Sequence, residues 1–100
     1  MDATNELKLV GQIVKVYPVK YTPVSLPIVS FVLEHKSRQF EAGKTREVKC
    51  RIYCLIVGAP NLVELELAEK FVAVSGFLNQ NARSQLVLHI NQLKFLDKGN

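Results

Sequence analysis

The chain has 100 residues, of which 48% are hydrophobic, and it carries a formal net charge of +4. These values fit one folded domain over residues 1–100 and exclude a disordered chain. Residues 1–5 and 97–100 are expected to be frayed ends of this domain. No apolar run approaches the roughly 18 residues that span a membrane. The start, MDATNELK, has no signal-peptide pattern, so the expected compartment is the cytoplasm.

The first half of the chain predicts three strands. Residues 6–17 are rich in β-branched side chains and predict a strand, in which Gly11 marks a bend or a close backbone approach. Three prolines within residues 18–27 predict a loop. A second strand is expected over 28–36, then a polar hairpin loop over 37–46, then a third strand over 47–57.

Alternation within the second and third strands assigns their side chains to faces. In the second strand, Phe31, Leu33 and His35 are expected to face the core, and Ser30, Val32, Glu34 and Lys36 to face outward. In the third, one face carries Val48, Cys50, Ile52, Cys54 and Ile56, and the other carries Lys49, Arg51, Tyr53 and Leu55. The outward face of the third strand therefore mixes cations with an aromatic ring.

The two cysteines, Cys50 and Cys54, lie in the same predicted strand. A rise of about 3.3 Å per residue places their Cα atoms about 13 Å apart, whereas a disulfide needs about 4.4–6.8 Å. They are therefore interpreted as small buried apolar residues. No metal site is expected, because only His35 and His89 are available to complete one and neither has zinc-finger spacing.

The second half of the chain predicts a short helix and two further strands. Pro60 suits a first helical turn, and Leu62 and Leu65 follow helical spacing within residues 58–69. Strands are expected over 70–78, with Gly76 as a second internal glycine, and over 85–96, joined by a polar turn at 79–84. An all-β chain of five strands with one short helix or turn after the third is typical of the OB-fold, a Greek-key β-barrel.

Positive charge is concentrated in one third of the chain. Eight Lys and Arg and three Glu lie between Lys15 and Arg51, whereas the remainder carries five basic and six acidic residues. Such a surface attracts polyanions, nucleic acid above all, because cations contact phosphates while aromatic rings stack on bases. The residues expected to bind nucleic acid are Lys15, Lys20, Tyr21, Lys36, Arg38, Lys44, Arg46, Lys49, Arg51 and Tyr53.

Other roles stay open for these side chains. Single lysines also serve to keep an outer face soluble, and Arg51 and Tyr53 also suit a subunit interface, where Arg and Tyr are enriched. Phe40 suits either a ring that stacks on a base or an anchor that packs the hairpin onto the domain, and the role of Tyr17 is likewise open. An enzyme is not expected, and neither is a cofactor, because the sequence has no Gly-rich phosphate loop, no nucleophile elbow and no paired-carboxylate motif.

Several motifs resemble known single-strand binding proteins. The run Tyr21-Thr22-Pro23-x-x-x-Pro27-x-x-Ser30-Phe31-x-Leu33 resembles bacterial single-stranded DNA-binding proteins in general. The segment Phe31-Val32-Leu33-Glu34-His35, followed by Glu41-Ala42-Gly43, is similar to the primosomal replication protein N (PriB) family. Val74-x-Gly76-Phe77, Val87-Leu88-His89 and Leu96-Asp97-x-Gly99 also fit, so the resemblance covers Leu7 to Gly99.

The resemblance implies an OB-fold homodimer that binds single-stranded DNA without sequence preference. It implies a role in replication restart, with the helicase PriA and with DnaT as partners, and neither a membrane nor a small-molecule substrate. The family's basic contacts match Lys15, Lys20, Lys36 and Arg46. Lys49 stands at the family's tryptophan position, Lys44 replaces a loop aromatic, and the 79–84 loop has only Arg83. These departures keep open a protein–protein adaptor whose basic face docks an acidic partner, and an RNA-binding OB domain.

Overall fold

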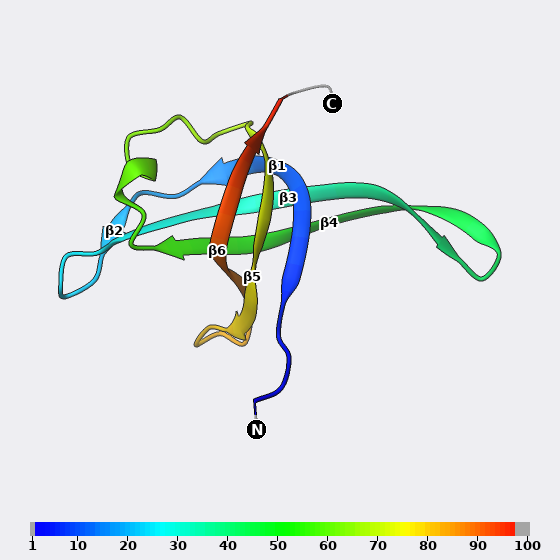
Figure 1. Cartoon of the computed structure of the whole chain (residues 1–100), viewed down its shortest axis with the longest axis horizontal. Coiled ribbons are helices and arrows are strands. Elements are labelled where there is room, and N and C mark those ends of the chain that lie inside the picture. Colours follow the sequence, from blue (N-terminus) through cyan, green and yellow to red (C-terminus); the bar gives the residue numbers. More distant parts are fainter. Residues whose placement is uncertain (1, 98–100) are drawn as a thin grey trace.

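The computed structural model describes residues 2–97, which form six strands and one 3₁₀ turn (Figure 1). The strands are β1 (Leu7–Val16), β2 (Lys20–Tyr21), β3 (Pro27–Glu41), β4 (Lys44–Val57), β5 (Phe71–Gln80) and β6 (Leu86–Leu96), and the 3₁₀ turn is η1 (Pro60–Leu62). In this part of the chain, no helix has the length and hydrophobicity that a membrane span requires.

The strands close into a barrel. They are hydrogen-bonded in the order β1-β5-β6-β4-β3-β2, and an additional pairing of β1 with β3 joins the two sides of the sheet. Every pairing is antiparallel except that of β4 with β6. Five long strands with a short turn between the third and fourth confirm the all-β OB-fold expected from the sequence.

Two glycines allow the barrel to curve tightly. β1 pairs with β5 along its first half and with β3 along its second half, so it must bend between them. Gly11 lies at this bend, where a Cβ atom would stand 2.4 Å from the carbonyl oxygen of Glu34. At Gly76, beside a register shift in the β5–β6 pairing, a Cβ atom would stand 1.9 Å from the carbonyl oxygen of His89. Both positions are close backbone approaches, as expected for glycines inside strands.

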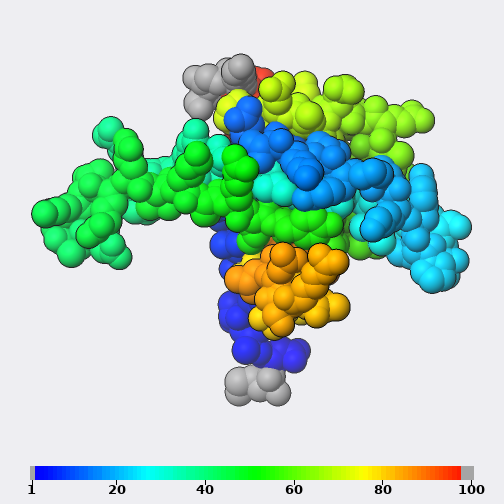
Figure 2. Space-filling view, turned by 180° about the vertical axis from the view of Figure 1, so that it is seen from behind, coloured from blue at the N-terminus to red at the C-terminus, as the bar shows by residue number. Residues whose placement is uncertain are grey.

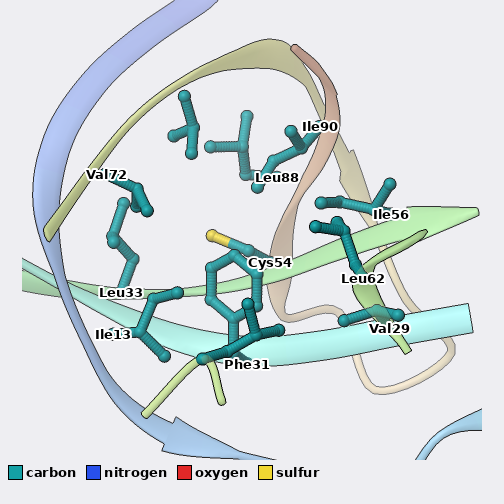
Figure 3. Packing of buried hydrophobic residues seen from close by; sticks show 12 residues of the cluster. Ile13, Val29, Phe31, Leu33, Cys54, Ile56, Leu62, Val72, Leu88 and Ile90 are labelled. Atoms are coloured by element: carbon teal, nitrogen blue, oxygen red, sulfur yellow. The ribbon is translucent and has the colours of Figure 1, made fainter. Parts of the chain in front are cut away.

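The core fills the barrel with aliphatic side chains around one aromatic ring (Figure 3). Phe31 and Leu33 of β3 and Cys54 of β4 are fully buried, and Ile56 is 8% exposed, as their alternation predicts. The outward half of the prediction was wrong for two residues of β3, because Ser30 is 6% and Glu34 9% exposed. Leu62 of η1 and Leu67 of the segment that follows complete this core. Packing of this kind stabilises the sheet whose outer surface is described below.

The β3–β4 hairpin departs from the sequence prediction, because residues 37–46 are not a loop. The strands continue to Glu41 and Lys44, and the turn is only Ala42-Gly43, with φ of 52° and 78°. Positive φ at both turn residues suits the twist of a two-residue hairpin. Beyond Glu34 in β3, and before Tyr53 in β4, no third strand pairs with either strand in the described part of the chain. Residues 35–50 therefore project as a two-stranded ribbon, here called the arm (Figure 1).

Three further expectations were wrong. Cys50 is exposed rather than buried, because it lies in the arm outside the barrel. The helix expected over 58–69 is reduced to the three residues of η1, and Leu65 is 49% exposed while Leu67 is buried. The 18–27 loop contains β2, which pairs with the start of β3 at the edge of the sheet, where prolines are tolerated.

Candidate nucleic-acid interface

Register places half of the predicted binding residues on one surface. Across the β3–β4 pair, Val32 lies opposite Tyr53, Glu34 opposite Arg51, Lys36 opposite Lys49, and Arg38 opposite Glu47. Opposite residues at alternate positions share a face of the sheet. This surface is called the outer face, and it carries five of the predicted site residues: Lys36, Arg38, Lys49, Arg51 and Tyr53.

β1 adds a cation and a second aromatic ring to the outer face. Lys15 pairs with Val32 across the β1–β3 junction. The Tyr17 ring, just after β1, meets the Tyr53 ring edge-on, with centroids 5.4 Å apart and planes at 65°. The Lys15 Nζ atom stands 5.0 Å from the Tyr17 centroid, within range of a cation–π contact. Two rings beside a cation provide both elements of single-strand recognition, stacking and phosphate contact.

A single carboxylate contacts three cations of the outer face. The Arg51 Nε group donates a 2.7 Å hydrogen bond to Glu34 Oε2. Lys36 Nζ lies 3.7 Å from Glu34 Oε1, and Lys49 Nζ lies 3.9 Å from Glu34 Oε2. The Glu34 side chain is only 9% exposed, whereas those of the three cations are 62–67% exposed. The hydrogen bond from Arg51 lowers the pKa of Glu34 against the opposing effect of desolvation, and the charges of Lys49, Arg51 and Lys36 lower it further.

The other predicted binding residues lie apart from this cluster. Lys20 and Tyr21 form β2, at the end of the sheet away from the arm (Figure 1). Lys44 and Arg46 lie near the tip of the arm, on the face opposite to Lys49 and Arg51 by alternation. The Arg46 Nε atom there contacts Glu41 Oε1 at 3.1 Å. The ten predicted residues therefore do not form one continuous patch.

A groove beside β4 extends the outer face towards the turn between β5 and β6. Its volume is about 890 Å³, and its lining includes Tyr17, Arg51 and Tyr53 from one side with Arg83 and Leu86 from the other. Figure 2 shows this turn, in orange, beside the barrel end of β4, in green. OB-folds bind oligonucleotides on the second and third long strands and the adjoining loops, so this position fits a ligand groove.

Sequence reasoning did not select Tyr17 and Arg83 as binding residues. The sequence does not decide the role of Tyr17, and its signal is the Lys15-x-Tyr17 spacing, which places both side chains on one side of an extended segment. Arg83 is the only cation in the β5–β6 turn, and only the fold brings it beside β4. Phe40 is 75% exposed in the arm, so it is not packed as an anchor.

Two further titratable side chains, His35 and Cys54, are fixed within the fold. The His35 ring joins the base of the arm to β1, with Nδ1 2.7 Å from the Val10 carbonyl oxygen and Nε2 2.7 Å from Ser37 Oγ. Burial raises the pKa of the Cys54 thiol to about 12, so this group is no nucleophile at neutral pH. Within residues 2–97, no group of three or more His, Cys, Asp or Glu side chains is placed to hold a metal ion.

Comparison with known proteins identifies the family of this chain. Residues 5–92 match the model of a family described as "another single-strand binding protein family". Replication restart protein PriB of Yersinia enterocolitica is 35% identical over 105 aligned residues, which cover 99% of each chain. The structure of PriB from Ralstonia solanacearum shares 31% identity with a TM-score of 0.83, covering 95% of this chain and all of that one.

A more distant solved structure shows the fold alone. It is described as the dimeric structure of the N-terminal domain of PriB from Thermoanaerobacter tencongensis, and it is 18% identical with a TM-score of 0.69. It covers 94% of this chain and 98% of that chain. The full-length similarity to Yersinia enterocolitica PriB and the family match decide the assignment. The chain belongs to the PriB family of replication restart proteins, within the OB-fold single-strand binding proteins.

Proposed function

We propose that this protein binds single-stranded DNA without sequence specificity, as an accessory component of the replication-restart primosome. The observation that carries the proposal is the outer face, where Tyr17 and Tyr53 lie in contact beside Lys15 and next to the cluster of Lys36, Lys49 and Arg51. The names of the full-length relatives support the biological setting.

The chemistry of this face explains binding without sequence preference. Lysine and arginine side chains contact phosphates, which are the same at every nucleotide. A base stacked on Tyr17 or Tyr53 contributes about 1–3 kcal/mol whichever base it is, because every base has a π-face. In a duplex the bases are already stacked on one another, so the rings have no partner there. The face therefore favours single strands over duplexes.

The protein acts in this proposal as a homodimer that binds rather than catalyses. The dimeric PriB domain of Thermoanaerobacter tencongensis supports the dimer, although its likeness to this chain extends to the fold alone. PriA and DnaT are the proposed partners, and the cytoplasm is the proposed compartment, both by analogy with replication restart.

One observation favours a second candidate, an OB-fold adaptor with weak nucleic-acid binding. Several cations of the arm and the outer face already contact carboxylates in the free chain: Arg51 contacts Glu34, Arg46 contacts Glu41, and Arg38 contacts Glu47 at 3.9 Å. The β5–β6 turn adds only Arg83. In this alternative the basic face docks an acidic protein partner.

Fluorescence anisotropy separates the two candidates. The protein is titrated into labelled oligo(dT) and into a matched duplex at about 50 and 200 mM salt. With about four phosphates contacted, the log–log slope of affinity against salt on the single strand is close to −3, and the duplex binds more weakly. No binding to oligo(dT) at about 50 µM protein, or equal binding to the duplex, would reject the single-strand function and favour the adaptor.

A further inference from the structure

Glu34 occupies an unusual position for a carboxylate on a DNA-binding face. It is 9% exposed and lies beneath three cationic side chains that are themselves more than half exposed. Its Oε2 atom accepts the hydrogen bond from Arg51 Nε and also lies 3.9 Å from Lys49 Nζ, while Oε1 faces Lys36 Nζ at 3.7 Å. No other carboxylate in residues 2–97 contacts three cations.

The other ion pairs of the chain are different in kind. Arg38–Glu47 and Lys8–Glu6 each join one cation to one carboxylate at 3.9 Å, with every side chain more than 60% exposed. Exposed ion pairs of this type contribute little to stability, because water and salt compete for both charged groups. The Glu34 network is shielded from water on the carboxylate side, so its attraction to the cations is screened less by salt.

The network acts on the same donors that a phosphate needs. Guanidinium and ammonium groups recognise carboxylate and phosphate oxygens through the same charge-assisted hydrogen bonds. Lys36 and Lys49 lie directly opposite each other, an arrangement in which like charges repel, and the carboxylate between them and Arg51 offsets that repulsion. Each cation is therefore drawn towards the sheet in the free protein, although its outward side stays open to solvent.

We propose that Glu34 is an internal counter-ion, which competes with DNA phosphates for Arg51, Lys36 and Lys49 and so limits the affinity of the outer face for single-stranded DNA. This inference rests on the proposed function. The lowered pKa of Glu34 supports it, because the carboxylate is then charged at neutral pH. Such a face binds DNA reversibly, because the Glu34 carboxylate can contact the cations again when a phosphate dissociates.

Glu34→Gln tests the counter-ion directly, because glutamine keeps the shape and removes the charge. One further unit of positive charge on the face steepens the salt slope on oligo(dT) by about 0.7, which corresponds to about fivefold tighter binding at 0.1 M salt. Glu6→Gln is the matched control: it makes the same change in net charge at a carboxylate whose only ionic partner is the exposed Lys8. Its expected effect is less than about twofold, because it is not in contact with the outer-face cations.

Each outcome has one meaning. If wild type binds oligo(dT) but Glu34→Gln binds equally or more weakly, the counter-ion role of Glu34 is refuted and the proposed function stands. If neither protein binds oligo(dT), both fail. If Glu34→Gln does not fold by circular dichroism, the carboxyl ¹³C signal of Glu34 in the wild type decides. That signal shifts when oligo(dT) saturates the protein if phosphates draw Arg51 away, and an unchanged signal overturns the proposal.

Discussion

Neutralising Lys36 and Lys49 together is the perturbation that isolates phosphate contacts of the outer face. The two residues are directly opposite each other, and replacing both with glutamine leaves the Arg51–Glu34 hydrogen bond in place. The substitution relieves the repulsion between the two facing lysines, but it also removes two of the three cations that contact the Glu34 carboxylate. We therefore expect the double variant Lys36→Gln/Lys49→Gln to stay folded by circular dichroism and to melt somewhat below the wild-type temperature, because Glu34 keeps only its hydrogen bond from Arg51.

The expected loss of DNA affinity follows from the number of contacts removed. Each phosphate contacted on a single strand contributes about 0.7 to the salt slope, so two lost contacts reduce the slope by about 1.4. If the part of the affinity that does not depend on salt is unchanged, a decade below 1 M salt this difference is about 25-fold. The double variant is therefore expected to bind oligo(dT) about 25 times more weakly at 0.1 M salt.

Anisotropy titrations over a salt series measure both the affinity and the slope. The control is Lys8→Gln/Lys94→Gln, which removes the same charge from two lysines that line a different surface, beside β1, β5 and β6. We expect its slope to stay within about 0.3 of wild type, which is less than half of one phosphate contact. A wild-type slope in Lys36→Gln/Lys49→Gln, or an equal reduction in the control, would refute the placement of phosphates on the outer face.

Three further predictions concern the fold and the site. Gly76→Ala is expected to lower the free energy of unfolding in urea by about 3 kcal/mol, because the added Cβ atom would stand 1.9 Å from a backbone oxygen. Gly43→Ala is expected to lower it by about 1–2 kcal/mol, because no atom lies within 4 Å but φ is +78°. Equal losses would refute the close backbone approach at Gly76. Folding raises the pKa of Cys54 from 9.0 to about 12, so the free energy of unfolding is expected to decrease as pH increases through this window, and Cys54→Ala should remove that part of the decrease. Tyr53→Ala is expected to weaken oligo(dT) binding by about 1–3 kcal/mol without changing the salt slope, and a changed slope would contradict a stacking role.

Alternation within the strands was enough to predict the centre of the core and to place half of the candidate binding residues on one face. Phe31, Leu33 and Cys54 face the core as their parity indicates, and Lys49 and Arg51 face outward. These residues belong to segments with one face buried, where a one-residue shift would expose the apolar set. In this part of the chain, the local pattern therefore determines which side chains face the core.

The arm could not be predicted in the same way. Both of its faces meet solvent, so no apolar alternation distinguishes a strand from a polar loop, and only the Ala42-Gly43 turn gives a local signal. The same absence of burial explains Cys50, whose parity continues that of Cys54 although the barrel ends between them.

Contacts between distant segments could not be predicted from the sequence either. The Tyr17–Tyr53 pair depends on how β1 crosses onto β3, where the register shifts between Ile13 and Lys15. The Glu34 network depends on the β3–β4 register, which brings Arg51 opposite Glu34. Composition revealed the excess of positive charge in this region, but it did not reveal that a carboxylate lies among the cations.

Mapping the bound DNA onto the protein shows whether a single strand lies on the outer face. Backbone amide NMR signals are assigned, and oligo(dT) is added until the spectrum no longer changes. We expect the largest shifts at Lys15, Tyr17, Lys36, Lys49, Arg51 and Tyr53, and small shifts at Val10, Ala73 and Lys94 on the surface beside β1, β5 and β6. Largest shifts at Val10, Ala73 and Lys94, with the outer face unchanged, would contradict the account.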